Sequence, residues 1–280
     1  MKKIAAMLLG LTMTLGLLAG CAGTKAPENT PAAETAAGST GTQETAQLDL
    51  ISQGVLTVGV EAAYPPFEYY AEDGTTIIGF DADVAAAIAQ ELGLELQFVD
   101  TAWDTIFQGC GTNYDVVISA ACINEVRKQY VDFSDPYISN YQAIVVPADS
   151  ELTFSALTDL SGYSVSMQKE TNSDIILQDL IDTGSVSNCV PVTNEKVTTC
   201  FEQLANGEVD VILCDSTVAD GYVAKEPDVY KIAYVDGDEV ENFGIAMKKG
   251  DTVMAAAINE ALQNLKDSGF LAECQSKWFG

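Results

Sequence analysis

Residues 115–137 read DVVISAACINEVRKQYVDFSDPY and contain Arg127, the only arginine in the 280-residue chain. The β-branched run 115–119 is typical of a buried strand, and the residues after it predict a turn and then a helix. Arg127 therefore lies just beyond the carboxyl end of a strand, where open α/β sheets bind ligands. A guanidinium holds a carboxylate through two parallel hydrogen bonds. Arg127 is either such a clamp or an exposed arginine paired with Asp132 or Asp135.

The same stretch resembles the signature of the family 3 extracellular solute-binding proteins, the polar amino-acid-binding proteins of ABC importers. That signature has a small residue, a Thr or Ser, an arginine and an Asp-Phe-Ser-Asp-Pro-Tyr-like segment, which correspond here to Ala120, Cys122, Arg127 and residues 132–137. Cys122 stands where the family usually has a hydroxyl that accepts from the ligand's ammonium group. Because a thiol is a weak acceptor, this sequence departs from the family in ammonium recognition.

The first 47 residues predict export and a membrane anchor. Residues 1–20 carry two lysines and an apolar run that is too short for a comfortable membrane span, which is the layout of a secretory signal peptide. The ending Leu-Ala-Gly-Cys resembles a bacterial lipobox, which implies lipidation of Cys21; the alternative is a plain signal peptide. Residues 21–47 have almost no large apolar side chains and predict a flexible linker. We expect an extracytoplasmic lipoprotein anchored to the cell membrane.

Composition excludes several classes of function. The formal net charge of −28 disfavours nucleic acid and anionic lipid surfaces as partners. The absence of histidine excludes Ser-His-Asp and Cys-His catalysis and His-ligated metal sites, so we expect no metal and no cofactor. Six cysteines follow Cys21, which allows up to three disulfides, but a chain of this size does not need them, and we predict free thiols. These are Cys110, Cys122, Cys189, Cys200, Cys214 and Cys274.

From residue 48 onward the chain is too long for one typical core, and we expect two lobes. A strand at 56–60, a helix at 79–92, a strand at 94–99 and a short helix ending near Gly109 precede the strand at 115–119. This βαβαβ order places the residues just after each strand around one crevice.

The family resemblance assigns roles to residues at that crevice. It implies that Tyr64 and Trp103 enclose the ligand side chain and that Glu61 makes a polar contact with it. Without the resemblance, core packing is the simpler interpretation of both aromatic rings. Asp81 and Asp83 are interpreted as helix-capping residues.

In the second lobe, a strand at 141–146 is the first of two expected hinge segments. In the family, the loop before the next helix has a Gly-Thr pair that binds the ligand carboxylate, and this role falls here to Thr171 and Asn172. Glu170 replaces the glycine, and its carboxylate could repel an anionic group or attract a cationic side chain. A buried strand then ends at Asp215, which the resemblance implies accepts the α-ammonium group; the alternative is a helix N-cap.

The predicted fold is therefore α/β, a two-lobe periplasmic-binding-protein fold of type II, with two hinge crossovers and a cleft between the lobes. The expected boundaries are 48–141 with 243–280 for lobe 1 and 142–242 for lobe 2. The expected ligand-binding residues all belong to the segments discussed above: Glu61, Tyr64, Trp103, Ala120, Cys122, Arg127, Thr171, Asn172 and Asp215.

The predicted function is binding of a polar or cationic amino acid for delivery to ABC permease subunits, by a monomer that closes around its ligand. One alternative is an enzyme of the same fold, similar to a cyclohexadienyl dehydratase, with Glu170 as general acid. Against it, one arginine is too few to hold two carboxylates of a dianionic substrate. A second alternative is a protein that presents its ligand to a signalling receptor. The sequence does not specify which amino acid is bound.

Overall fold

The computed structural model describes residues 47–280. The expected signal peptide, the lipidated Cys21 and the expected linker up to residue 46 lie outside the described residues. Among the residues that are described, no helix has the length and apolar character that a membrane crossing needs.

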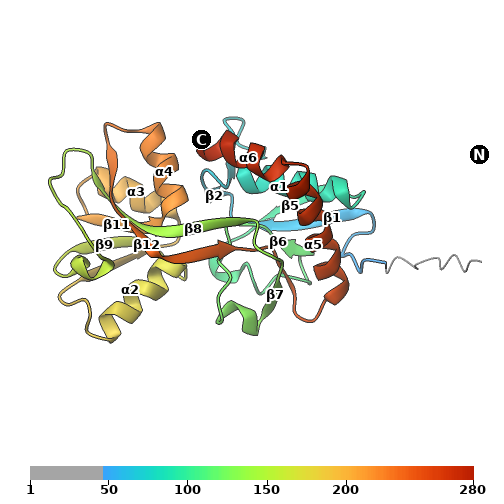
Figure 1. Ribbon diagram of the computed structural model, residues 1–280, viewed down its shortest axis with the longest axis horizontal. Helices are drawn as coiled ribbons and strands as arrows, with labels where there is room; N and C mark the ends of the chain where they lie inside the picture. Colours follow the sequence, from blue (N-terminus) through green and yellow to red (C-terminus); the bar gives the residue numbers. More distant parts are fainter. Residues whose placement is uncertain (1–46) are drawn as a thin grey trace, which may run out of the picture. The chain divides into compact units, whose positions relative to one another are not determined.

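The first lobe is built on a five-stranded sheet with the order β5-β1-β6-β13-β7 (Figure 1). Strand β1 is parallel to both β5 and β6, as the βαβαβ pattern predicts. Helices α1, α5 and α6 pack against one another beside this sheet. The elements are β1 (Val55–Val60), α1 (Phe80–Glu91), β5 (Glu95–Asp100), β6 (Val116–Val117), β7 (Val131–Phe133), β13 (Ala246–Lys248), α5 (Thr252–Asp267) and α6 (Phe270–Phe279).

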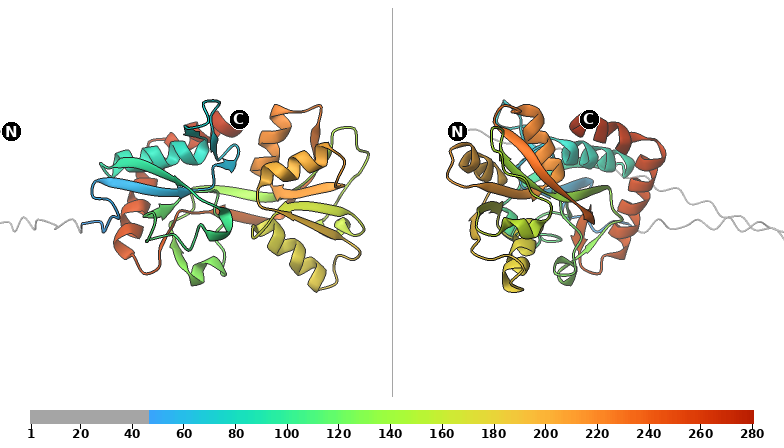
Figure 2. Two further views of the ribbon diagram at one scale, coloured as in Figure 1. Left: turned by 180° about the vertical axis from the view of Figure 1, so that it is seen from behind. Right: turned by 60° about the vertical axis from the view of Figure 1, so that its left-hand side comes forward.

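The second lobe has its own five-stranded sheet, with the order β10-β9-β11-β8-β12. Strands β9, β10 and β11 are parallel to one another, while β8 and β12 run antiparallel to their neighbours. The views in Figure 2 show the helices of this lobe beside its sheet. The elements are β8 (Ile138–Pro147), β9 (Ser164–Gln168), α2 (Asn172–Asp182), β10 (Val190–Asn194), α3 (Val197–Ala205), β11 (Val211–Asp215), α4 (Ser216–Lys225) and β12 (Tyr230–Phe243).

Two strands carry the chain between the lobes. The chain passes from β7 of the first sheet into β8 of the second, and it returns from β12 to β13 (Figure 1). Strands β8 and β12 are paired along their length, with irregularities between Ile232 and Tyr234 and between Asp236 and Glu241. Two crossovers and two α/β lobes are what the sequence predicts, and the residue boundaries given for the lobes stay a prediction.

Several local elements differ from expectation. The residues around Arg127 form only a 3-10 turn, η2 (Arg127–Gln129), rather than a regular helix, and Trp103 lies in another such turn, η1 (Trp103–Thr105). The expected return strand at 242–250 is divided between the end of β12 and β13. A small antiparallel sheet follows β1 and was not predicted: β2 (Ala63–Tyr64), β3 (Glu68–Tyr70) and β4 (Ile77–Ile78).

The capping roles expected for two aspartates are wrong. Helix α1 has Gly79 at its N-cap and no side-chain cap. Asp81 is wholly buried and accepts from the backbone N–H of Ala120, 39 residues away. Asp83 accepts from Lys277 and from the indole of Trp278, so it ties α1 to α6. Both carboxylates serve tertiary contacts rather than the helix end.

The cysteine prediction is confirmed for the described part of the chain. All six thiols after Cys21 are free, and five of them are buried. They behave as small apolar side chains, as free cysteines generally do in cores. No group of three or more metal-ligating side chains occurs within residues 47–280.

Candidate functional site

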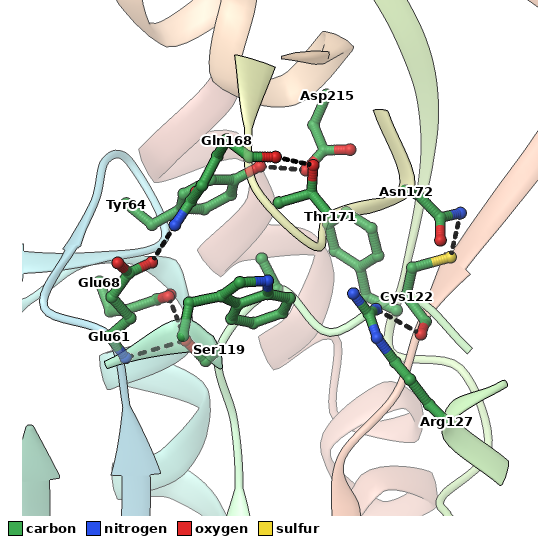
Figure 3. A pocket seen from close by; sticks show the side chains of 13 residues that line it. Glu61, Tyr64, Glu68, Ser119, Cys122, Arg127, Gln168, Thr171, Asn172 and Asp215 are labelled. Atoms are coloured by element: carbon green, nitrogen blue, oxygen red, sulfur yellow. Dashed lines mark hydrogen bonds between the residues drawn. The ribbon is translucent and has the colours of Figure 1, made fainter. Parts of the chain in front are cut away.

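A small cavity lies between the lobes and is lined by residues from both; about 310 Å³ there is free of protein atoms, including space open to solvent. All nine residues that the sequence singles out line it, together with four that it does not. Figure 3 shows Glu61, Glu68 and Ser119 toward one end and Arg127, Cys122 and Asn172 toward the other. The four additional residues are Glu68, Ser119, Gln168 and Phe243.

The strand ends explain why these residues meet. Glu61 directly follows β1, and Ala120 lies three residues beyond β6. Gln168 and Asp215 are the last residues of β9 and β11 in the other lobe. Parallel strands end at the same edge of a sheet, and here the two edges face each other across the cavity. Ser119 and Gln168 could have been found by this rule alone, whereas Glu68 and Phe243 carry no such signal.

Arg127 is buried at the edge of the cavity, with 7% of its surface exposed. Its guanidinium donates to the backbone carbonyl of Cys122 at 2.8 Å and to that of Glu170 at 3.3 Å. It also lies over the rings of Trp103 and Phe107, and the distance from Arg127 Cζ to each ring centroid is 4.9 Å. Burial lowers its pKa.

No carboxylate of the described residues pairs with this guanidinium, since the salt bridges found there all involve lysines. Asp132, one of the surface partners considered, pairs with Lys249 at 2.6 Å instead. A buried cation without an anion is unfavourable, so the cavity favours an anionic ligand group beside Arg127.

Asp215 is the acidic counterpart in the second lobe. Tyr64 of the first lobe donates its hydroxyl to one carboxylate oxygen, and Asn140 and Gln142 donate to the other at 2.7 and 3.2 Å. Burial and the nearby Glu241 raise the pKa of Asp215 to about 7. Asp215 stands at the N-cap position of α4 but makes no side-chain cap hydrogen bond, so the capping alternative is not supported.

Glu61 marks the end of the cavity away from Arg127. Gln168 donates its amide N–H across the lobes to Glu61 at 2.7 Å. Burial raises the pKa of Glu61 to about 7, although the hydrogen bond from Gln168 acts in the opposite direction. The amide oxygen of Gln168 is buried and has no donor among residues 47–280. This end of the cavity therefore offers acceptors to a ligand that carries donors.

The N-terminus of α2 reaches the cavity through Thr171 and Asn172. Thr171 is the N-cap and accepts from the backbone N–H of Asp174. The side chain of Asn172 is already used: it donates to Cys122 Sγ at 3.0 Å and to Glu241 at 2.9 Å, and it accepts from Asn124 at 3.0 Å. Only the backbone N–H groups of this helix end remain for an anion.

Cys122 contributes a neutral sulfur to the wall. Burial raises the pKa of its thiol, so the thiolate does not form near neutral pH. Its sulfur accepts from Asn172, which links the two lobes at the Arg127 end. At the position where the family usually has a hydroxyl, Cys122 therefore supplies a hydrogen bond between the lobes. Its neutral thiol does not act as a nucleophile.

Glu170 does not place its carboxylate in the closed cavity. The side chain is 54% exposed and lies 3.7 Å from Lys169, whereas the backbone carbonyl accepts from Arg127 and from the indole of Trp103. The residue has φ of 59°, a left-handed conformation that glycine adopts without strain. Having glutamate instead of the family's glycine at position 170 therefore changes the backbone strain of this loop more than it changes the charge in the cavity.

Replacing Glu170 by glycine is expected to raise the free energy of unfolding by about 0.5 to 1 kcal/mol, because relief of the left-handed strain outweighs the entropy cost of glycine. Urea unfolding of the wild type and Glu170→Gly measures this change. Ligand affinity should be retained, because the carbonyl that contacts Arg127 remains. A large loss of affinity would show that the carboxylate itself takes part in binding.

Comparisons with known proteins agree with this geometry. Residues 56–280 match the model of the bacterial extracellular solute-binding proteins, family 3. The chain is 32% identical over 230 residues to the L-cystine-binding protein TcyJ of Escherichia coli K12, covering 81% of this chain and 84% of that protein. It is 27% identical over 229 residues to ABC transporter arginine-binding protein 1 of the same strain, covering 80% and 90%.

A solved structure of an ancestral arginine-binding protein bound to arginine superimposes with a TM-score of 0.75 at 35% identity. The match covers 81% of this chain and 99% of that one. The two-lobe periplasmic-binding-protein fold of type II is thereby confirmed. The chain belongs to the family 3 bacterial extracellular solute-binding proteins.

Proposed function

We propose that this protein binds a single polar or cationic α-amino acid in the cavity between its lobes and delivers it to the permease of an ABC importer. The observation that carries the proposal is the pairing of opposite charges around one small cavity: a buried guanidinium without an anion, Arg127, and a buried carboxylate, Asp215. A zwitterion satisfies both groups, because its carboxylate and its ammonium are held a fixed short distance apart.

The carboxylate of the ligand binds between Arg127 and the first turn of α2, where the helix dipole and free N–H groups favour an anion. Its ammonium group binds Asp215, which Tyr64 orients from the opposite lobe. The rings of Tyr64 and Trp103 enclose the ligand's aliphatic carbons. Ala120 and Cys122 close the wall behind the α-carbon.

The side chain of the ligand extends toward Glu61 and Gln168. A carboxylate and an amide oxygen without a donor suit a side chain that ends in N–H donors. The relatives named as arginine-binding and cystine-binding proteins bind ligands with several such donors, which is consistent with a polar or cationic amino acid here.

Binding and closure are linked because the ligand touches both lobes. Six hydrogen bonds already join the lobes beside the cavity. Tyr64 donates to Asp215, Gln168 to Glu61, and Trp103 and Arg127 to the carbonyl of Glu170, while Asn172 donates to Cys122 and accepts from Asn124. A ligand that bridges the lobes stabilises the closed population, which the permease distinguishes from the open one.

The remaining parts of the proposal concern the segment outside the described residues and the assembly. We infer lipidation of Cys21 after signal cleavage, so that a monomer is held at the outer face of the cell membrane by lipid and the segment 22–47 serves as its tether. Metabolic labelling with a fatty-acid analogue tests this, because replacement of Cys21 by serine should abolish the label and release the protein.

A thermal-shift panel of the twenty amino acids, ornithine, cystine and prephenate tests the function. At a hundredfold excess over its Kd, the true ligand is expected to raise the melting temperature by about 5 to 10 °C. If no amino acid shifts the transition, the proposal is wrong. A shift with prephenate alone, accompanied by turnover, would support the dehydratase alternative, which the exposed position of the Glu170 carboxylate disfavours.

A further inference from the structure

Two buried carboxyl groups are neighbours at the first-lobe wall of the cavity: Glu68 lines the cavity, and Asp81 lies next to Glu68 without lining the cavity itself. Glu68 on β3 and Asp81 on α1 are each 0% exposed. They meet because the backbones of the two segments approach closely: a Cβ at Gly79 would lie 2.0 Å from the carbonyl oxygen of Phe67. The N–H of Asp81 donates to that same carbonyl.

Each carboxyl group has one oxygen with donors and one without. Ser119 donates its hydroxyl to Glu68 Oε1, while the N–H of Ala120 and the hydroxyl of Tyr137 donate to Asp81 Oδ2 at 2.6 and 3.0 Å. Glu68 Oε2 and Asp81 Oδ1 have no donor among residues 47–280. Two buried carboxyl oxygens that lack donors are unfavourable next to each other unless one of the groups carries a proton that it donates to the other.

The groups around the pair supply no positive charge. The ionisable groups that face it are the Glu61 carboxylate at the end of β1, the Tyr64 hydroxyl on β2, the Tyr137 hydroxyl and the Cys274 thiol on α6. The nearest lysine on α6, Lys277, pairs with Asp83 instead. Two neighbouring carboxylates without a cation cannot both be ionised at neutral pH.

We propose that Glu68 is protonated and donates its proton to Asp81, so that the two carboxyl groups act as one unit that holds the Ser119–Ala120 turn of the ligand site in place. Glu68 and Asp81 are thus positioning residues, which act on the ligand through the wall of the cavity. This goes beyond the proposed function, which assigns no role to either residue.

The turn needs such support. Ala120 has φ of 43°, a left-handed conformation that is strained for a non-glycine residue. Strand β6, which leads into the turn, is only two residues long, so its ladder holds the turn weakly. The N–H of Ala120 is held by Asp81, and Ser119 is held by Glu68 and accepts from the N–H of Glu61 at 3.0 Å.

The direction of the pKa shifts agrees with the proton residing on Glu68. Burial raises the pKa of Glu68 far above its usual value, and the neighbouring Asp81 raises it further. Burial also raises the pKa of Asp81, but only to about 6, because the hydrogen bonds from Ala120 and Tyr137 favour its ionised form. Near neutral pH, Glu68 is the acid of the pair and Asp81 the base.

Replacing Glu68 by glutamine tests the proposal without ligand. The amide keeps a donor for Asp81 and an acceptor for Ser119 but cannot ionise. In the wild type, unfolded Glu68 ionises above its ordinary pKa of 4.5 while folded Glu68 stays protonated, so this residue lowers stability as pH rises. The ratio of unfolding constants, wild type over Glu68→Gln, is therefore expected to increase by up to tenfold per pH unit above about 4.5.

The exposed Glu72, on the loop after β3, is the matched control, and Glu72→Gln should show no such trend. Infrared spectra provide a direct second readout: at pH 7 the wild type should show a carbonyl band of a buried protonated carboxyl that Glu68→Gln lacks, beyond the bands of Glu61 and Asp215, whose pKa values are about 7 and which both proteins share. Parallel stability curves, or a wild type without that band, would overturn the shared proton.

Ligand affinity then separates positioning from a purely structural role. Glu68→Leu, which lacks the donor and acceptor, should bind the ligand found in the thermal-shift panel at least tenfold more weakly than Glu68→Gln, which keeps both. Equal affinity in a folded Glu68→Leu protein would overturn the positioning role. The stability and infrared measurements need no ligand. They would therefore still test the shared proton if the proposed amino-acid binding proved wrong, so the two failures can be told apart.

Discussion

Replacing Arg127 by alanine is expected to weaken amino-acid binding by about 2 to 5 kcal/mol, which is roughly 30-fold to several thousandfold in Kd. The ligand carboxylate would be buried in the closed cavity without its cation, and no lysine lines that cavity to replace it. Isothermal titration calorimetry with the ligand from the thermal-shift panel measures the change.

Arg127→Lys is the matched control for charge. It keeps a cation but loses the planar fork of donors, so we expect affinity between those of the wild type and Arg127→Ala. Circular dichroism of the ligand-free variants shows whether both are folded. Wild-type affinity in a folded Arg127→Ala protein would mean that the carboxylate binds elsewhere, and the proposed orientation of the ligand would have to be abandoned.

Affinity is also expected to depend on pH through Asp215. Its pKa in the ligand-free protein is raised to about 7, mainly by burial. A bound ammonium group requires the ionised carboxylate, so binding below pH 7 must displace a proton. Affinity should therefore rise about tenfold per pH unit well below pH 7 and level off above it, a gain of about fiftyfold between pH 5 and pH 7.

Two variants identify the group responsible. Asp215→Asn should bind weakly at pH 8 and lose the slope. Glu61→Gln removes the other cavity carboxylate whose pKa is about 7, so the slope that remains in this variant belongs to Asp215. Calorimetry in buffers of different ionisation enthalpy should detect the release of up to one proton at pH 6. A flat affinity profile from pH 5 to 8 would exclude Asp215 as the ammonium partner.

The elements that the sequence predicted well are those with strong local signals. Strand β1 and helix α5 have clear apolar patterns, and α5 begins at Asp251, whose side chain accepts from the N–H of Met254. The turn at Arg127 and the sheet of β2, β3 and β4 were missed because they are short and are stabilised by distant partners. Periodicity cannot reveal an element that spans two or three residues.

The candidate site divides in the same way. Residues at strand ends, such as Glu61 and Asp215, follow from strand order and the family signature. The orientation of a side chain does not: Asn172 is occupied by Cys122 and Glu241, and the Glu170 carboxylate faces away from the closed cavity. Each of these outcomes depends on where the opposite lobe lies.

By itself, the sequence determined two α/β lobes and a single arginine at a strand end, because length, composition and apolar pattern are properties of the chain itself. The type II fold and the role of Asp215 were implied by the family resemblance. Only the tertiary structure decided that Arg127 is buried without an anion among residues 47–280 and that Glu68 and Asp81 are buried neighbours, each with one oxygen that has no donor in that part of the chain. Burial and proton sharing depend on groups far apart in sequence, since desolvation is set by everything that packs around a charge.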